Sequence, residues 1–463
     1  MNNSKLLTGL LSAVLTSLGT CAYAYGAPPQ SEQASAAPSA RTDSASAPGA
    51  RKTFTLKELF ESAETNGVHL RPLLTAEKQA EKEVSVAKNG RLPEINAALS
   101  LSFIGDGFTT KRDFSDYEPA PIPHLGNGFS VKLEQALYTG GAIKNAIDMA
   151  KLQGTAARYA TDFQRDNIRF RLAGFYLDLY KYANLRKVVS QNIAQARQVL
   201  EDMNVRYRQG TALQNEITRY ELLVSNLELQ LLRIENTLDI LNQNLVVTAG
   251  LPEGTVVLPD SAIFAEALPQ NTPSWWQTEA EQNAPLLQLA ETGVAIGRKA
   301  EALVKSERLP QIGVQAAWLL DGPILVEIPP IDRNLSYWYV GLGIHYNFSS
   351  LYKSNRKLAA SRLSTQKAVE QLDVERQNIA MAVHADYIRY MEAYRTLNTQ
   401  QKSVELAKRN YHTTSTRYAA DMALITDMLD AANACLEAEQ QLVNARIDIL
   451  YFYYKLLFTT GKI

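Results

Sequence analysis

The sequence predicts a mainly α-helical chain whose long antiparallel coiled-coil helices form a trimeric α-barrel, together with a smaller membrane β part. Four strands per chain would contribute to a twelve-stranded transmembrane β-barrel. Three observations lead to this prediction. The chain contains two copies of one plan, apolar residues recur about every 3.5 residues over long stretches, and shorter stretches alternate polar with apolar residues.

Composition excludes several classes of protein. The 463 residues are 46% apolar and 21% charged, with 47 Lys and Arg against 48 Asp and Glu. A chain this apolar can bury a core, which excludes disorder throughout. Its balanced charge gives no excess of basic residues that would favour binding to nucleic acid. The only long apolar stretch is N-terminal, and its densest part, Leu6 to Leu18, is too short to span a membrane. A polytopic helical membrane protein is therefore excluded.

The first residues are typical of an export signal. Lys5 precedes the apolar run, and Ala22-Tyr23-Ala24 supplies the pattern for cleavage after Ala24, so we expect a signal peptide at 1–24. Leu18-Gly19-Thr20-Cys21 also forms an imperfect lipobox, which leaves lipidation of Cys21 open as an alternative. Residues 25–52 are rich in Ala, Ser and Pro and are expected to be a disordered leader.

A duplication organises the rest of the chain. Arg91-Leu92-Pro93-Glu94-Ile95 recurs 217 residues later as Arg308-Leu309-Pro310-Gln311-Ile312, and Arg206-Tyr207 recurs 211 residues later as Arg417-Tyr418. Each copy is too long for a solenoid repeat, which indicates duplication of a large module. Four prolines between the copies predict an irregular, extended connection. The expected parts are repeat 1 at 53–250, a linker at 251–274 and repeat 2 at 275–463.

Each repeat is expected to end in a helical hairpin. Apolar residues and Tyr recur in alternating steps of four and three from Leu213 to Leu245, and the same steps recur from Leu424 to Leu456. This period is the pattern of a coiled-coil seam, in which Cys435 would be a small hydrophobic residue. The preceding helix of repeat 1 keeps the period with one break, at Arg186. The predicted hairpins are 142–248 and 353–459.

Alternating stretches of about ten residues lie between the helices of each repeat, and this is the length of a tilted membrane strand. Aromatic residues at Trp318 and at Tyr337-Trp338-Tyr339 lie where an interfacial girdle would. From the strands alone, a soluble hairpin with one apolar face is an equally open interpretation. The predicted strands are about 95–104, 129–138, 312–320 and 338–348.

Four strands cannot close a barrel, and an open strand edge is not tolerated in lipid. The strands must therefore pair with strands of other copies of the chain. Three copies would supply twelve strands, an even number within the known range, and twelve long helical arms. This arithmetic favours a trimer and does not exclude a tetramer.

Short motifs follow one another in a specific order. Arg-Leu-Pro-x-Ile precedes the first strand of each repeat, Leu133 to Gly141 leads from strand to helix, and Tyr207 to Gly210 and Thr426 to Ala431 stand at the helical turns. In this order they resemble the TolC-like outer membrane efflux protein family, over roughly residues 54–461. The resemblance implies a homotrimer in the outer membrane of a Gram-negative bacterium, whose twelve-stranded barrel continues into a periplasmic α-barrel.

The resemblance also implies a function without catalysis. The family provides the exit duct of tripartite efflux pumps or type I secretion systems, with a periplasmic adaptor (membrane fusion) protein and an inner-membrane transporter as partners. No enzyme activity and no cofactor is expected, and the five histidines form no HExxH motif. The alternative function is a periplasmic coiled-coil scaffold or adaptor that does not span the membrane. The transported substrate stays open between drug, metal ion and protein.

Acidic residues near the second turn are candidates for the pore aperture. Asp427 and Asp430 are three residues apart and share a helix face, and Glu216 is the repeat-1 equivalent of Asp427. In a trimer each would recur three times around the axis, and a ring of carboxylates in a narrow aperture attracts cations. A solvated acidic face near a helix N-terminus is the alternative.

Residues at the two turns are candidates for tip gating and adaptor contact. They could link helices in a closed state that an iris-like loosening would open. The alternative is a helix-end cation that satisfies carbonyl groups, next to a seam Tyr. The second turn lacks the glycine of the first, and Ala423 stands where some family members have a basic residue that ties the closed tip. The candidates are Arg206, Tyr207, Gly210, Arg417, Tyr418 and Asp421.

Overall fold

The structure is a computed structural model that describes residues 51–264, 268–327 and 330–463. These residues belong to one unit, Pro48–Ile463. The expected signal peptide, Cys21 and nearly all of the expected leader lie outside the described residues. Strand β1 (Arg51–Phe54) begins before the expected end of the leader at residue 52, because it pairs in parallel with β6 (Val256–Pro259). Arg51 and Lys52 are therefore strand, which corrects the leader's end.

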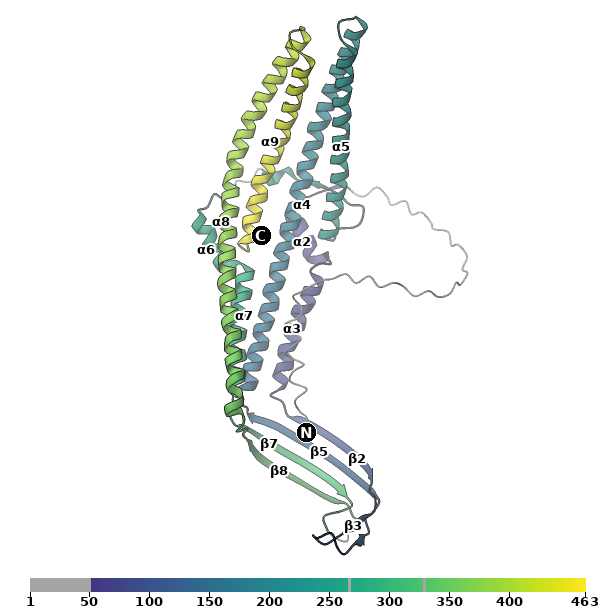
Figure 1. Cartoon of the computed structure of the whole chain (residues 1–463), viewed down its shortest axis with the longest axis vertical. Coiled ribbons are helices and arrows are strands. Elements are labelled where there is room, and N and C mark those ends of the chain that lie inside the picture. Colours follow the sequence, from purple (N-terminus) through teal and green to yellow (C-terminus); the bar gives the residue numbers. More distant parts are fainter. Residues whose placement is uncertain (1–50, 265–267, 328–329) are drawn as a thin grey trace, which may run out of the picture. The chain divides into compact units, whose positions relative to one another are not determined.

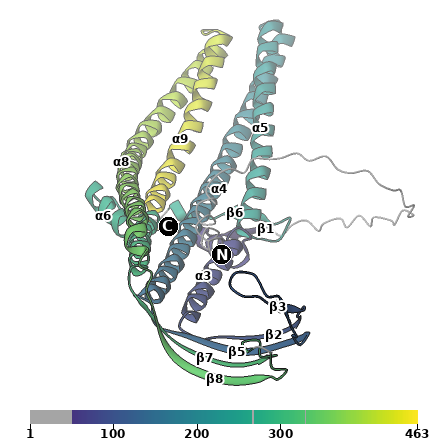
Figure 2. The same ribbon diagram turned by 60° about the horizontal axis from the view of Figure 1, so that its bottom comes forward.

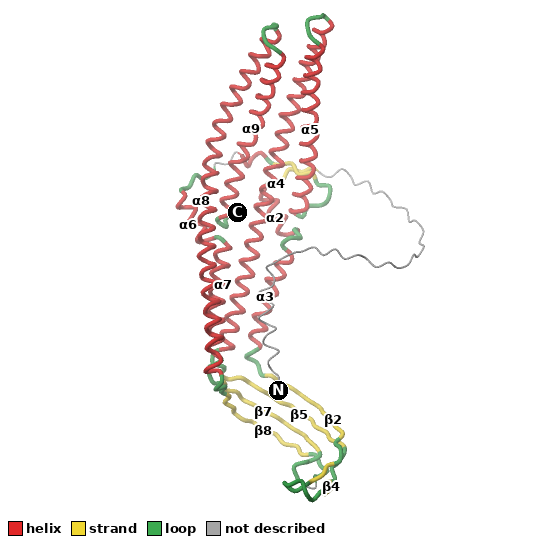
Figure 3. Tube along the Cα trace, in the orientation of Figure 1, coloured by secondary structure: helices red, strands yellow, loops and turns green. Residues whose placement is uncertain are grey.

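Two long helical hairpins account for most of the fold. In repeat 1, α4 (Ala142–Arg208) packs along α5 (Gln214–Ala249), and in repeat 2, α8 (Ser350–Ala419) packs along α9 (Ile425–Thr459) (Figures 1 and 3). The 67 residues of α4 correspond to about 100 Å of helix. No proline interrupts either hairpin, so nothing in the backbone chemistry forces a break.

Shorter helices extend along the ends of the hairpins. Helix α3 (Arg71–Asn89) packs against α4, while α7 (Pro285–Ser306) packs against both α4 and α8 and so joins the two repeats. Helix α2 (Leu56–Asn66) contacts α4 and α5, and α6 (Pro273–Asn283) contacts α8. The described part of the expected linker is not simply extended, because it also contains the short 3₁₀ helix η1 (Ser261–Phe264).

The coiled-coil seams form the core of each hairpin. Along α5, the residues of the predicted series after Leu213 are all buried or half-buried, and Leu213 itself is exposed at the turn. In α4 the series fails at Arg186, which is exposed, and the buried position shifts to Leu185. A straight helix has 3.6 residues per turn, so a 3.5-residue pattern drifts around it and must shift over many turns.

A four-stranded antiparallel sheet lies where α3 and α7 end and where α4 and α8 begin. Its strands are in the order β2-β5-β7-β8 (Figure 2). Each strand contains most of one predicted stretch, although β5 begins four residues earlier than expected and β8 ends three residues earlier. Two short strands, β3 and β4, pair within the loop between β2 and β5. The bounds are β2 (Glu94–Phe103), β3 (Gly107–Thr109), β4 (Glu118–Ala120), β5 (Leu125–Tyr138), β7 (Gln311–Gly322) and β8 (Leu335–His345).

Strand register separates the side chains into two different faces. Val131, Trp318 and Trp338 lie in one row across the sheet, whereas the next row along the strands contains Lys132 and Tyr339. The aromatic cluster expected at 337–339 is therefore divided, with Trp338 on the apolar face and its two tyrosine neighbours on the polar face. Among the described helices, none has both the length and the apolar character needed to cross a membrane.

Candidate functional site: the helical tips and the joint between the hairpins

Both hairpins turn through a residue in the left-handed backbone conformation. Gly210 has φ +77° in the first turn, and Asp421 has φ +58° at the equivalent position of the second. In each turn the N–H of the following residue donates to the carbonyl of the equivalent arginine, Arg206 at 3.0 Å and Arg417 at 2.8 Å. Aspartate tolerates this conformation better than most non-glycine residues. The missing glycine therefore leaves the path of the second turn unchanged.

The two acids after the turns cap their helices. Glu216 Oε2 accepts a hydrogen bond from the backbone N–H of Leu213 at 3.3 Å, and Asp427 Oδ2 accepts one from Leu424 at 3.2 Å. These N–H groups precede the first helical turn and have no partner within the helix, so the carboxylates satisfy them. Asp427 and Asp430 are both exposed, and a capping role does not remove them from solvent.

Arg206 joins the first tip to the second within one chain. Its guanidinium donates to the carbonyl of Ala419 at 2.5 Å and lies 3.3 Å from the Asp421 carboxylate. It also lies over the ring of Tyr418, 6.0 Å from the centroid. Two contacts of different kinds thus hold one cation, and the Tyr418 ring covers it.

Tyr418 reaches back to the first hairpin. Its hydroxyl oxygen lies 3.5 Å from Glu216 Oε2. Burial, with the nearby Glu216 carboxylate as the next cause, raises the pKa of the Tyr418 phenol to about 12, so it stays protonated and able to donate. The candidates that the fold brings together are therefore Arg206, Glu216, Tyr418 and Asp421.

The remaining candidates stay apart from this link. Arg417 is the repeat equivalent of Arg206, but its guanidinium reaches only the carbonyl of Met422 in its own turn, at 3.5 Å. Tyr207 is exposed on α4, and Asp430 makes no hydrogen bond or ion pair within the described part of the chain. Equivalent positions in the two repeats thus have different surroundings, because only one arginine faces the other hairpin.

Comparison with known proteins finds similarity to one family. The model of the family described as "Outer membrane efflux protein" matches residues 276–461. The chain is also 23% identical over 411 residues to the pyoverdine export outer membrane protein OpmQ of Pseudomonas aeruginosa, covering 85% of this chain and 82% of that protein. The second repeat of the chain thus matches the outer membrane efflux protein family. The resemblance seen in the sequence motifs is thereby confirmed.

Solved structures of outer membrane proteins share the fold of this chain. VceC of Vibrio cholerae is 16% identical and superposes with a TM-score of 0.73 over 88% of this chain and 96% of VceC. The outer-membrane channel OprN is 15% identical, with a TM-score of 0.75 over 94% of this chain and 99% of OprN. The matched family, OpmQ, VceC and OprN are all described as outer membrane proteins.

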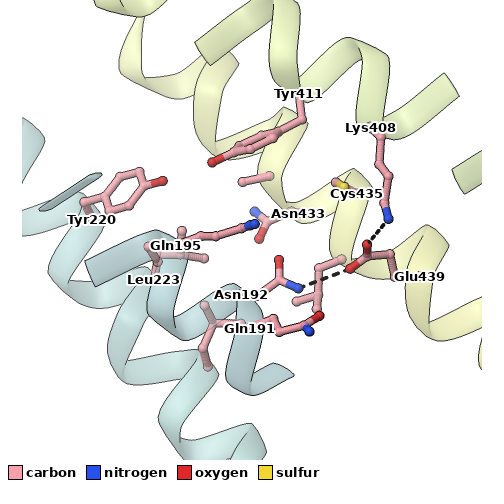
Figure 4. Close-up of a pocket in the computed structure, with 14 residues that line it drawn as sticks. Gln191, Asn192, Gln195, Tyr220, Leu223, Lys408, Tyr411, Asn433, Cys435 and Glu439 are labelled. Carbon is pink, nitrogen blue, oxygen red and sulfur yellow. Dashed lines mark hydrogen bonds and ion pairs between the residues drawn. The ribbon is translucent and has the colours of Figure 1, made fainter. Parts of the chain in front are cut away.

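A cavity of roughly 310 Å³ lies between the two hairpins of the chain, at some distance from the tips (Figure 4). On one side of it, Asn192 Nδ2 of α4 donates to Glu439 Oε2 of α9 at 3.2 Å. Lys408 of α8 lies 2.8 Å from the other oxygen of Glu439. On the other side, the hydroxyls of Tyr220 and Tyr411 point toward each other. The sequence motifs give no indication of these residues, since the contact between α4 and α9 spans 247 positions.

A second group that the motifs do not reveal surrounds Asp166 of α4. Its side chain is only 8% exposed, and burial raises its pKa to about 6, against the opposing effect of Arg169. Arg169 is itself paired with Glu64 of α2 and donates to the carbonyl of Ile463 at 2.7 Å. No cluster of His, Cys, Asp or Glu within the described ranges could hold a metal ion.

Proposed function

We propose that three copies of the chain assemble into one duct, with twelve strands closing a β-barrel and the helices forming an α-barrel. Strands β2 and β8 are the outer strands of the four-stranded sheet, and each has one unpaired edge among the described residues. Neither edge could stay open in lipid, so each would pair with an edge of a neighbouring copy.

The observation that carries this proposal is the exposed apolar face of the sheet. Phe103 is 82% exposed and Val340 66% exposed, and the face they share is mainly apolar on all four strands, with Asn127, Gln135 and Ser336 as polar members. Such a surface is costly in water and favourable against lipid. This favours a duct over a periplasmic scaffold, which would have no use for a lipid-facing sheet. The other apolar residues of the face are Ile95, Ala97, Leu99, Leu101, Leu125, Phe129, Val131, Leu133, Ile312, Val314, Ala316, Trp318, Leu320, Trp338, Leu342 and Ile344.

The duct would be the exit of a tripartite efflux pump or a type I secretion system. Its partners would be a periplasmic adaptor and an inner-membrane transporter, as is typical of the family. Pyoverdine export is the role in the name of OpmQ.

The helical tips would gate the duct. The contacts of Arg206 with Ala419 and Asp421 hold the two hairpins of one chain together at their ends. An adaptor that engages the exposed turn residues Tyr207, Gly210 and Arg417 would loosen these contacts and let the hairpins move apart.

The acids after the turns would line the aperture of the gated end. Glu216, Asp427 and Asp430 are close to the turns, and Asp427 and Asp430 are exposed. Repeated three times around an axis, their carboxylates would attract cations and bias the permeant ions.

Two measurements test the duct. Outer membrane fractions should contain a heat-modifiable trimer, and the purified trimer should form conducting channels in a planar lipid bilayer. Recovery of the chain as a soluble periplasmic monomer would contradict the proposal.

A further inference from the structure

The two hairpins of one chain are linked at two levels. The outer level is the tip, where Arg206 contacts Ala419 and Asp421. The inner level is the cavity, where Asn192 of α4 contacts Glu439 of α9. Fourteen residues of α4 separate Arg206 from Asn192, which corresponds to about 21 Å along the helix.

An ion pair within its own hairpin holds the Glu439 side chain in position for this contact. Lys408 is on the neighbouring helix α8, and its ammonium lies 2.8 Å from Glu439 Oε1. The other oxygen, Oε2, accepts the hydrogen bond from Asn192 (Figure 4). The hydrogen bond that the Lys408 ammonium donates to Glu439 raises the pKa of Lys408, which is the sign of a favourable pair of charged groups. A hydrogen bond to an ionised carboxylate is stronger than one between neutral groups.

Asn192 is held in place on the other side. Its amide nitrogen also donates to the carbonyl of Val188, one turn earlier in α4, at 2.9 Å. The amide therefore points out from α4 at a fixed angle, with its second hydrogen available for Glu439. Asn192 and Glu439 each have a second partner within their own hairpin, which reduces the side-chain freedom that the contact costs.

The contact lies beside a local gap in the packing. The cavity of roughly 310 Å³ lies directly beside it, lined by Gln191, Gln195 and Asn433 as well as by the two partners. Where side chains interdigitate, dispersion contacts resist separation, and a cavity provides none across the gap. Apolar residues of both hairpins, among them Ala196 and Leu436 beside the cavity, belong to one hydrophobic cluster, so the hydrogen bond is a polar restraint that acts in addition to this packing.

We propose that the contact between Asn192 and Glu439 is an inner latch, which holds the hairpins together behind the tip and must break when the duct opens. This inference rests on the proposed gating function. It predicts that loss of the tip link alone opens the duct incompletely, because the inner latch still restrains each pair of hairpins.

Single-channel conductance of the purified trimer tests the latch in a background where the tip link is already broken. Arg206→Ala should raise the open population, and adding Asn192→Ala should raise the ratio of open to closed channels by about a further fivefold, the effect of one lost hydrogen bond. Gln191→Ala is the matched control, because Gln191 lines the same cavity and makes no hydrogen bond across it among the described residues. Adding the control to Arg206→Ala should change nothing.

A reversible bridge gives a second readout. Asn192→Cys and Glu439→Cys would be combined with Arg206→Ala and with Cys435→Ser, since Cys435 lines the same cavity. A short bis-methanethiosulfonate linker should return the channel to low conductance, and reduction should reopen it. Equal conductance in the bridged and reduced states, or no effect of Asn192→Ala, overturns the latch while the duct stands. If Arg206→Ala trimers, checked by their heat-modifiable band, fail to conduct at all, the proposed duct itself fails.

Discussion

Asp421 in the second turn adopts the left-handed backbone that Gly210 adopts in the first, with φ +58° against +77°. Unlike Gly210, it also carries a carboxylate, which lies 3.3 Å from the Arg206 guanidinium of the other hairpin. One residue thus closes a turn and joins two hairpins, and substitution can separate the two roles.

Asp421→Gly keeps the turn and removes the carboxylate, whereas Asp421→Ala also leaves a Cβ in the left-handed region at a cost of about 1 kcal/mol. We expect both variants to conduct more than the wild type. The Asp421→Ala variant should have a lower midpoint of thermal unfolding than the Asp421→Gly variant. Equal midpoints would show that the backbone conformation does not matter here.

Arg206 and Arg417 are equivalent in the duplication and form a matched pair. Arg206→Ala removes the contacts with Ala419 and Asp421 and should raise single-channel conductance. Arg417→Ala removes only a long contact within its own turn, 3.5 Å to Met422, and should leave conductance near the wild-type value. The tip link would be refuted by equal conductance of the two variants.

Val340 and Gly341 are neighbours on β8 that lie on opposite faces of the sheet. Val340→Lys puts a charge on the apolar face, at a cost of about 2–4 kcal/mol if that face meets the middle of the bilayer. Gly341→Lys adds a side chain where no atom lies within 4 Å of the new Cβ, on the polar face. We expect the first to reduce the yield of heat-modifiable trimer and the second to assemble. Similar yields would argue against a lipid-facing apolar surface.

Asp166 predicts a pH dependence of stability. Burial raises its pKa to about 6 from the ordinary value of 3.8, so the folded chain binds this proton more tightly than the unfolded chain. The ionised carboxylate therefore costs stability above about pH 6, and the cost disappears as the pH falls toward 3.8.

Asp166→Asn removes this cost and should stabilise the chain at pH 8 by about 2 kcal/mol, with a smaller gain at pH 4.5. Thermal unfolding at both pH values measures it. Asp162→Asn is the control, because Asp162 already pairs with Arg165 at 2.5 Å and should not be stabilised by the change. A pH-independent difference between Asp166→Asn and the wild type would contradict the assigned cause.

Asp427 and Asp430 test the aperture. Replacing both with asparagine removes their charge, and the amide oxygen introduced by Asp427→Asn can still accept the hydrogen bond that the carboxylate receives from Leu424. We expect weaker block of single-channel current by divalent cations, measured with unchanged trimer stability. Block at wild-type strength would remove these carboxylates from the aperture.

Local patterns in the sequence account for much of the fold because they record which face of an element is buried. The series of steps along α5 from Leu213 matches its buried side, since a seam residue must be apolar wherever the partner helix lies. The same reasoning fails at Arg186, where the drift of a straight helix moves the buried position to Leu185. It also fails at Tyr337 to Tyr339, because a cluster in sequence is divided by the alternation of a strand.

The sequence by itself determined the duplication, the helical seams, the strands and the family, because each leaves a periodic or ordered trace along the chain. Only the tertiary structure decided that Arg206 rather than Arg417 joins the hairpins, and that Asn192 meets Glu439 across 247 positions. These contacts depend on which sides of two helices face each other, and a single hydrogen bond between distant residues imposes no period on either helix.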